Sequence, residues 1–234
     1  MPLVALAFDV YGTVVDWRGS ILRAAQSLSS PAARRLDWPR VADAWRRRYQ
    51  PTLARVNQGD LGWRPFDELQ RLMLDEVLTE FAASDLPDGE RARLASVWAA
   101  MDAWPDAVAG LTRVKRGAIV SALSNGSIRQ LVGIARHAGL PWDLVLSVEL
   151  FGAYKPDPRV YRGAVDLLQC QPSEVMMVAA HTYDLRAAQA QGMQTAFVER
   201  PREWGPDGVA EPIGDDHFDL VVADLEQLAQ RLGY

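Results

Sequence analysis

The sequence predicts an α/β protein with a doubly wound parallel sheet that is interrupted by an inserted helical subdomain. Short, continuous apolar runs over 3–8, 117–123 and 175–180 are typical of buried strands. After residue 105 such runs alternate with helical stretches of about ten residues, the pattern of βαβ units. Between residues 16 and 104 no comparable apolar run occurs, and this stretch is predicted to be helical.

The predicted elements divide the chain into a core and an insert. We expect residues 1–15 and 105–234 to form the α/β core, and residues 16–104 to form a helical cap inserted after the first strand. The cap is rich in Ala, Leu, Arg, Glu and Gln, and its helices are separated by breakers at Pro31, Pro39, Gly59, Pro65 and Pro87. A cap in this position lies above the strand ends and can close over a site there.

The remaining core elements follow in order. Helices are expected over 106–115, 128–138, 159–169 and 184–191, with Gly139 and Gly192 ending the second and the fourth. Strands are expected over 144–148, 195–199 and 218–222, and a last helix ends near Leu232. In a sheet of this kind the functional site lies at the carboxyl ends of the strands.

Composition and charge argue against several classes of function. The chain has 234 residues, of which 49% are hydrophobic, enough for a full core. Its net charge of −5 gives no overall attraction to nucleic acid. We expect no membrane association, because no apolar stretch approaches the ~20 residues that cross a bilayer, and no signal peptide. A single cysteine, Cys170, excludes an internal disulfide and favours a reducing, cytoplasmic location.

Four polar clusters follow predicted strands. They are Asp9 with Thr13, Ser124 with Asn125, Lys155, and His181 with Asp184. Because the carboxyl ends of parallel strands share one edge of the sheet, we expect these clusters to meet in one crevice. Lys155 is one of only two lysines among 25 lysines and arginines, which indicates that a compact ammonium is needed there.

These motifs resemble those of the haloacid dehalogenase (HAD) superfamily. The match comprises Asp9-Val10-Tyr11-Gly12-Thr13, Ser124-Asn125-Gly126, Tyr154-Lys155-Pro156-Asp157 and Asp184, in the same order over essentially the whole chain. The sequence is most similar to the type II L-2-haloacid dehalogenases, through the Tyr-Gly-Thr after Asp9, Ala44-Trp45-Arg46 in the cap, and Arg159-Val160-Tyr161. The resemblance implies a HAD-like Rossmannoid core with an inserted cap.

Two positions separate this sequence from the phosphatases of the superfamily. Phosphatases read Asp-x-Asp in the first motif, and their second acid protonates the leaving alkoxide; here that position is Tyr11. They also hold Mg²⁺ with an acid pair in the fourth motif, and one acid of that pair is Ala180 here. Since Mg²⁺ prefers an octahedral set of oxygen ligands, we expect neither a metal nor a cofactor. A halide leaves without a proton, so both changes favour attack on carbon.

The resemblance implies covalent catalysis on 2-haloalkanoates. Asp9, with Thr13 beside it, would attack C2 and expel halide, and water would then release a 2-hydroxy acid from the aspartyl ester. Lys155 would keep Asp9 ionised. Asp184 would orient or activate the water, with His181 sharing the role of base.

The same resemblance implies a set of substrate contacts. Ser124 and the backbone N–H groups near Val10 and Tyr11 would hold the substrate carboxylate. Arg46 and Asn125 would receive the halide, so the site would be complete only when cap and core meet. The Tyr161 hydroxyl is expected to touch Asp9 or Lys155. Candidate walls of the halide pocket are Trp63, Phe66 and Tyr183.

One stretch departs from the best-known dehalogenases of this type. They read Ser-Ser-Asn-x-Trp-Asp where this chain has Ala179-Ala180-His181-Thr182-Tyr183-Asp184. A hydroxyl and an amide are replaced by other groups, and an imidazole and a phenol are gained. The expectation that His181 acts as a base rests on this exchange.

The favoured function is metal-independent hydrolytic dehalogenation of short (S)-2-haloacids, with fluoroacetate included if the halide pocket is small. One alternative is a Mg²⁺-dependent phosphatase on the same core, which EDTA would inactivate. Another is a non-catalytic binding protein of the same fold, although a buried Asp9–Lys155 pair argues against it because such a pair costs desolvation. The expected partners are a 2-haloalkanoate, water and halide, and a homodimer is an open expectation.

Overall fold

The computed structural model describes residues 3–234, and its centre is a six-stranded sheet in the order β3-β2-β1-β4-β5-β6. Every neighbouring pair of strands is parallel. The doubly wound parallel sheet predicted from the sequence is therefore confirmed, while residues 1 and 2 of the predicted core lie outside the described residues. The strands are β1 (Ala5–Phe8), β2 (Ile119–Ser124), β3 (Leu144–Ser147), β4 (Val175–Ala179), β5 (Gln194–Val198) and β6 (Leu220–Val222).

Strand β1 lies in the middle of the sheet and fixes the place of the site. Its four residues are all buried, because a central parallel strand is covered on both faces and is therefore apolar throughout. It pairs with β2 on one side and β4 on the other. The chain therefore adds β2 and β3 on one side of β1 and then crosses over to add β4, β5 and β6 on the other side. Such a reversal of strand order opens a crevice at the carboxyl ends of the strands.

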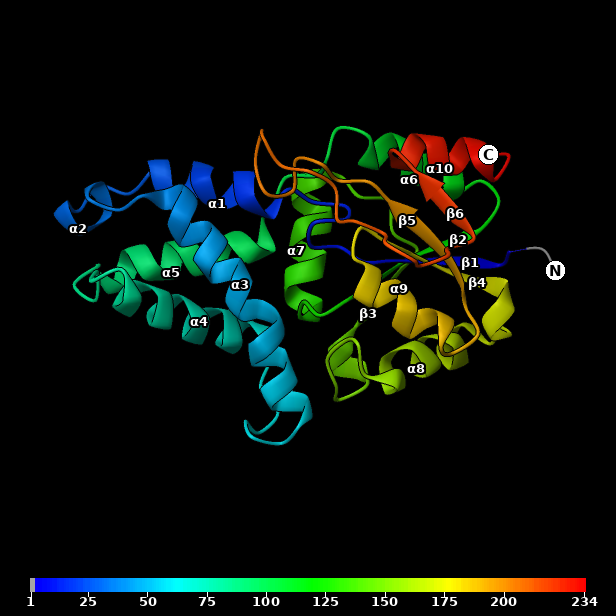
Figure 1. Cartoon of the computed structure of the whole chain (residues 1–234), viewed down its shortest axis with the longest axis horizontal. Coiled ribbons are helices and arrows are strands. Elements are labelled where there is room, and N and C mark those ends of the chain that lie inside the picture. Colours follow the sequence, from blue (N-terminus) through cyan, green and yellow to red (C-terminus); the bar gives the residue numbers. More distant parts are fainter. Residues whose placement is uncertain (1–2) are drawn as a thin grey trace.

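Five helices accompany the sheet within the described core. Helices α6 and α10 pack against each other on one face, and α8 and α9 lie on the other (Figure 1). Local sequence sets the ends of α7: Ser127 and Gln130 form a reciprocal capping box, and Gly139 ends the helix with a φ of 68°. The helices are α6 (Ala107–Val114), α7 (Ile128–Ala138), α8 (Pro158–Leu168), α9 (Thr182–Gln189) and α10 (Leu225–Arg231).

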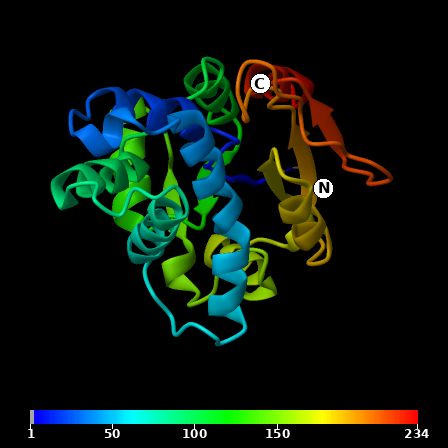
Figure 2. The same ribbon diagram turned by 60° about the vertical axis from the view of Figure 1, so that its left-hand side comes forward.

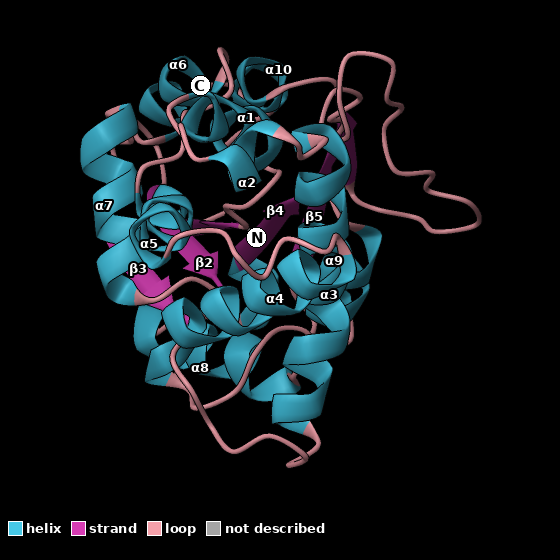
Figure 3. Ribbon diagram, turned by 90° about the vertical axis from the view of Figure 1, so that its left-hand side faces the viewer, coloured by secondary structure: helices cyan, strands magenta, loops and turns pink. Residues whose placement is uncertain are grey.

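A second group of helices lies between β1 and α6 in the chain. They gather at the end of the sheet opposite the N-terminus (Figure 1), and Figure 3 views the molecule from their side. The predicted breakers lie at their starts: Pro31 begins α2, and Pro65 and Pro87 precede α4 and α5. These helices are α1 (Trp17–Gln26), α2 (Pro31–Arg34), α3 (Trp38–Asn57), α4 (Phe66–Glu80) and α5 (Asp88–Ser96), and short 3-10 helices follow at Val97–Ala99, Val148–Leu150 and Pro172–Glu174. The division of the chain into two domains stays a prediction.

Polar contacts join the helical group to the segments that connect the strands of the sheet. Asn57 at the end of α3 donates from Nδ2 to the Tyr154 carbonyl at 2.8 Å, and the Tyr154 N–H donates back to Asn57 Oδ1 at 2.9 Å. Ser127 Oγ donates to Asp67 Oδ1 of α4 at 2.8 Å. Helix α3 crosses in front of the sheet in the turned view of Figure 2. Within residues 3–234 no helix is both long and apolar enough to cross a membrane.

Candidate active site

Asp9 directly follows β1, is only 4% exposed and accepts hydrogen bonds on both oxygens. Lys155 Nζ donates to Oδ1 at 2.9 Å, and Thr13 Oγ1 donates to Oδ2 at 2.9 Å. His181 Nδ1 lies 3.1 Å from the same Oδ2. Residues from three separate strand ends thus meet on one carboxylate, as the sequence predicted for this crevice.

The backbone forms a tight turn directly after Asp9. Val14 and Val15 both donate their N–H groups to the Val10 carbonyl, and Gly12 donates to the Val15 carbonyl at 3.1 Å. Gly12 has a φ of 91°, and a Cβ there would lie 2.3 Å from Glu203 Oε1. Only glycine fits, because the backbone is left-handed and a carboxylate approaches it closely.

The turn also leaves two backbone donors free. Asp9 donates its N–H to the Val178 carbonyl at 2.9 Å. The N–H groups of Val10 and Tyr11, the next two along the chain, have no acceptor within residues 3–234. Since buried backbone donors normally have partners, both N–H groups are available to an acceptor that these residues do not themselves supply.

The first side of Asp9 is built from core residues. Lys155 is fully buried, and its Nζ lies 2.5 Å from Asp184 Oδ2 as well as 2.9 Å from Asp9. Tyr161 donates its hydroxyl to Asp184 Oδ1 at 2.5 Å. The expectation that this hydroxyl touches Asp9 or Lys155 is wrong, because α8 brings it to Asp184 instead. Both oxygens of Asp184 are occupied, so its geometry suits it to hold Lys155.

Charge and burial oppose each other in this group. Burial would raise the pKa of Asp9, but Lys155 and His181 outweigh burial and hold that pKa well below its usual range. Burial would lower the pKa of Lys155, but Asp184 and Asp9 raise it above its usual range. Burial raises the pKa of Asp184. The Lys155 ammonium, which Asp9 and Asp184 share, therefore favours the ionised form of Asp9.

The second side of Asp9 is a histidine with its own carboxylate. His181 is the residue before α9, and its Nε2 lies 3.1 Å from Glu203 Oε1. That oxygen also accepts a hydrogen bond from Trp17 Nε1 at 2.9 Å and lies 3.5 Å from Arg46 Nη2. The segment carrying Glu203 is anchored by Arg200, which donates to the Thr13 carbonyl at 2.8 Å.

The two carboxylates at His181 favour its imidazolium form. Burial would lower its pKa, but Glu203 and Asp9 raise it to about 10. Burial would raise the pKa of Glu203, but His181 and Arg46 lower it to about 2. The 3.3 Å separation of Arg46 Nη2 from His181 Nε2 is therefore not a hydrogen bond in this state, since both atoms are donors.

The predicted substrate residues surround this centre. Asn125 accepts from the Lys155 N–H at 2.8 Å through Oδ1 and donates from Nδ2 to the Tyr49 hydroxyl at 3.0 Å. Ser124 ends β2 and is fully buried. The Tyr11 hydroxyl lies 3.3 Å from Gln130 Oε1 and 3.4 Å from the Trp98 carbonyl. The Tyr11 side chain is therefore directed toward Gln130 and Trp98, and position 11 supplies no carboxylic acid to protonate a leaving group.

The three candidate pocket walls differ in their positions. Phe66 is fully buried and contacts the Tyr11 ring at 5.6 Å and the Tyr49 ring at 5.4 Å between centroids. Tyr183 stacks on His181 at 5.7 Å. Trp63 is 43% exposed and stacks on Tyr154, so it lies outside the polar cluster.

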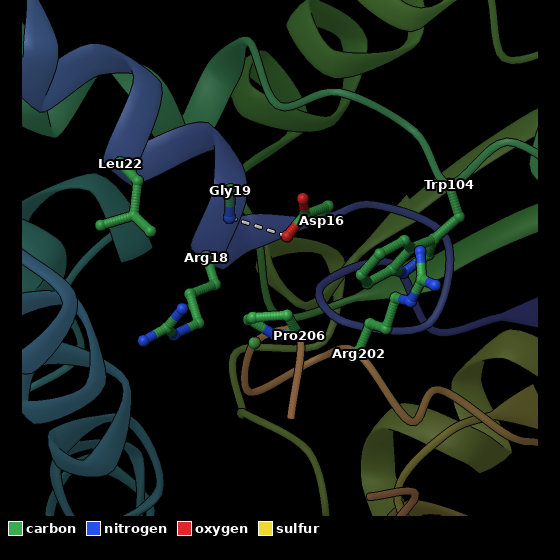
Figure 4. Close-up of a pocket in the computed structure, with 8 residues that line it drawn as sticks. Asp16, Arg18, Gly19, Leu22, Trp104, Arg202 and Pro206 are labelled. Atoms are coloured by element: carbon green, nitrogen blue, oxygen red, sulfur yellow. Dashed lines mark hydrogen bonds between the residues drawn. The ribbon is translucent and has the colours of Figure 1, made fainter. Parts of the chain in front are cut away.

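Two cavities lie near the cluster. One of about 240 Å³ reaches His181 and Arg46 from the surface and is lined also by Gln50, Tyr183, Trp204 and Glu211. The other, of about 300 Å³, lies beside the start of α1, with Asp16, Arg18, Leu22, Trp104, Arg202 and Pro206 around it (Figure 4). Its Asp16 carboxylate caps α1 by accepting from the Gly19 N–H at 2.7 Å. Since no predicted site residue lines this second cavity, we place the site at Asp9.

The residues around Asp9 do not fit a Mg²⁺ ion. The position between Asp9 and Asp184 is taken by the Lys155 ammonium, and Asp9 Oδ2 faces His181. Ala180 stands where the phosphatase pattern has a second acid, so it offers no side-chain oxygen to a metal. Its N–H donates to Thr13 Oγ1 at 2.9 Å. A hard divalent cation needs several oxygen ligands, and these residues offer too few that are free.

Sequence reasoning missed three residues of the site: Trp17, Tyr49 and Glu203. Glu203 follows β5 in an irregular segment, where no motif or periodicity marks a functional carboxylate. The one available signal was His181 itself, because a buried histidine next to a carboxylate needs an acceptor for its second nitrogen.

Comparisons with known proteins identify the family of this chain. A family model for haloacid dehalogenase-like hydrolases matches residues 3–192. (S)-2-haloacid dehalogenase 1 of Pseudomonas sp. (strain CBS-3) is 32% identical over 87% of this chain and 88% of its own, and (S)-2-haloacid dehalogenase 4A of Burkholderia cepacia is 32% identical over 85% and 84%. A solved L-2-haloacid dehalogenase is 42% identical with a TM-score of 0.89, covering 99% of this chain and 100% of its own; a solved defluorinating L-2-haloacid dehalogenase is 38% identical with a TM-score of 0.90, covering 99% and 96%. The chain belongs to the haloacid dehalogenase-like hydrolase family.

Proposed function

We propose that this protein hydrolyses short (S)-2-haloacids to 2-hydroxy acids through an ester on Asp9, without a metal. The observation that carries the proposal is the ionised, buried carboxylate of Asp9, held by Lys155 at 2.9 Å and by His181 at 3.1 Å. Relatives named as (S)-2-haloacid dehalogenases match most of the chain and support the substrate class.

In the first half-reaction an Asp9 oxygen attacks C2 of the haloacid. The new C–O bond forms as the carbon–halogen bond breaks, and the halide leaves with the bonding electrons. Lys155 and Thr13 hold Asp9 ionised and oriented, which keeps it an effective nucleophile. The free N–H groups of Val10 and Tyr11, with Ser124, bind the substrate carboxylate.

In the second half-reaction His181 changes from an acid to a base. Ester formation removes the charge of Asp9, one of the two carboxylates that raise the pKa of His181. The imidazolium then loses its Nδ1 proton to solvent and keeps its Nε2 proton on Glu203, which fixes the tautomer as the carboxylate of a catalytic triad does. Neutral His181 takes a proton from water, and the resulting hydroxide adds to the Asp9 carbonyl carbon.

The cycle closes with balanced protons. The tetrahedral intermediate expels the alkoxide of the 2-hydroxy acid, which takes the proton from His181. Asp9, now a carboxylic acid, returns its own proton to His181 and restores the resting ion pair. Each turnover therefore releases one halide and one proton, and the proton leaves with ester formation.

The fluoroacetate and partner expectations belong to the same proposal. The solved defluorinating relative, at 38% identity, supports fluoroacetate as a substrate. The contacts of Tyr49 with Phe66 and Asn125, both predicted halide-pocket residues, support a small halide pocket. A homodimer and a cytoplasmic location stay predictions.

The test is halide release from fluoro-, chloro- and bromoacetate and from both enantiomers of 2-chloropropionate, with and without EDTA. We expect release that favours the (S) enantiomer and is unchanged by EDTA. A phosphatase would instead turn over p-nitrophenyl phosphate and lose that activity in EDTA. Absence of halide release from every substrate would reject the proposal.

A further inference from the structure

Two buried donors on α3 have no acceptor among the described residues. Among the described residues, Arg46 Nε makes no hydrogen bond. The Tyr49 hydroxyl oxygen accepts from Asn125 Nδ2 at 3.0 Å, but no acceptor within residues 3–234 receives its own hydrogen. The Arg46 guanidinium lies 4.4 Å from the centre of the Tyr49 ring, so the two side chains are in contact.

The surroundings hold the Tyr49 hydroxyl in a defined position. Tyr49 is only 3% exposed, and its ring packs edge-on against Phe66. Asn125 is fixed from its other end, because its Oδ1 accepts from the Lys155 N–H at 2.8 Å. Burial raises the pKa of Tyr49 to about 12, so the hydroxyl keeps its proton at neutral pH.

Buried donors of this kind are destabilising unless an acceptor arrives. The acceptor that the proposed reaction creates beside Asp9 is the departing halide. We propose that the Tyr49 hydroxyl, with Arg46 and Asn125, donates a hydrogen bond to that halide and selects for the halides that accept hydrogen bonds most strongly. This inference rests on the proposed dehalogenase function and adds a specificity residue to it.

The chemistry makes the effect depend on the leaving group. As the bond from Asp9 to C2 forms, the electrons of the carbon–halogen bond pass to the halide, and Tyr49 keeps its proton throughout. Fluoride is the smallest halide and the strongest hydrogen-bond acceptor, whereas bromide is large and leaves readily unaided. A donor placed where charge develops lowers the barrier, and it acts more strongly on a smaller ion because the same charge lies closer to it.

The variant Y49F removes the hydroxyl and keeps the ring beneath Arg46. Ester formation is measured in single turnovers with fluoro-, chloro- and bromoacetate. We expect the fluoroacetate rate to fall by about 10²-fold, the loss seen when one such donor is removed, and the bromoacetate rate to fall far less. The chloroacetate rate should lie between them, so the chloride-to-bromide ratio carries the same test.

The matched control is Y154F. Tyr154 also loses a buried hydroxyl, but that hydroxyl donates to the Arg64 carbonyl at 2.6 Å. Its ratio of rates between halides should stay that of the wild type. Equal loss for all halides in Y49F, as expected if Tyr49 binds the substrate carboxylate or only supports the fold, would overturn the inference, as would no loss. Failure of the wild type to release any halide would instead reject the proposed function.

Discussion

The two sides of Asp9 resemble each other in plan and differ in one chemical property. Each side places a cation between Asp9 and a second buried carboxylate: Lys155 with Asp184, and His181 with Glu203. The ammonium has its pKa raised above an already high usual range, so it stays charged throughout. Glu203 and Asp9 together raise the pKa of His181 to about 10, so part of that shift depends on the charge of Asp9.

In the proposed mechanism, this difference assigns each side of Asp9 to one of the two half-reactions. A permanent cation suits ester formation, which needs Asp9 as an anion. A cation that depends on the charge of Asp9 suits ester hydrolysis, which needs a base only after that charge is lost. The permanent side, Lys155 with Asp184, comes entirely from residues after 150. The switchable side, His181 with Glu203, also contacts Trp17 of α1 and Arg46 of α3.

The largest expected effect is on the permanent side. Lys155→Met leaves Asp9 and Asp184 buried without their shared cation, so Asp9 becomes a poor nucleophile. We expect ester formation to fall on the order of 10⁴-fold, as for loss of a core catalytic group. Single-turnover halide release measures it, and a small loss would show that His181 alone keeps Asp9 ionised.

The other lysine of the chain supplies the control for that experiment. Lys115 pairs with Asp143 at 2.6 Å on the surface. Both residues precede strands, β2 and β3, so the pair lies at the amino ends of the strands, away from Asp9. Lys115→Met removes the same charge by the same substitution. Its rate of ester formation should equal that of the wild type.

The next effect separates the two sides. His181→Asn should slow ester hydrolysis by about 10²- to 10⁴-fold, the usual contribution of a general base, with a smaller effect on ester formation. The esterified Asp9 then accumulates and is seen as a mass increase of the intact protein. Glu203→Gln should give the same trapped ester to a lesser degree. Normal turnover in both variants would remove the switchable side from the account.

A pH study sharpens the comparison without mutating the base. Once Asp9 is esterified, His181 faces Glu203, Arg46 and Tyr183, and its pKa falls below the value of about 10 that the two carboxylates give it together. Ester hydrolysis should therefore decline as the pH falls and His181 becomes protonated, whereas ester formation should stay level from about pH 5 to 9, because the pKa of Asp9 lies well below that range. Loss of a carboxylate in Glu203→Gln should move the hydrolysis midpoint to lower pH, and an unmoved midpoint would contradict the pairing.

The smallest effect is on stability. The pKa of His181 is raised from 6.5 to about 10 on folding, so its contribution is complete below pH 6.5 and is lost as pH rises through 10. Over that range unfolded chains lose the proton that folded ones keep. We expect the wild-type advantage in Tm over His181→Asn to shrink between pH 6 and pH 9. A constant difference would mean that His181 contributes no charge to the fold.

The sequence predicted most of the permanent side and only part of the switchable one. Asp9 follows β1, Lys155 lies in the connection from β3 to α8, and Asp184 lies in the first turn of α9 after β4. All three therefore lie at the carboxyl edge of the parallel sheet, where the topology brings them together. Glu203 lies in an irregular segment after β5, and its contact with His181 depends on Arg200 binding the Thr13 carbonyl. The contact of Tyr161 and the exposure of Trp63 likewise depend on packing between elements, which residue patterns do not encode.

The most direct test of the covalent account is a single turnover in H₂¹⁸O with enzyme in excess over (S)-2-chloropropionate. Mass spectrometry then locates the label in the product and in the peptide that contains Asp9. The account predicts ¹⁸O in the Asp9 carboxylate and an unlabelled hydroxyl in the lactate, because the product oxygen comes from Asp9 and water attacks the ester carbonyl. Label in the lactate hydroxyl with none in Asp9 would mean that water attacks C2 directly and would contradict it.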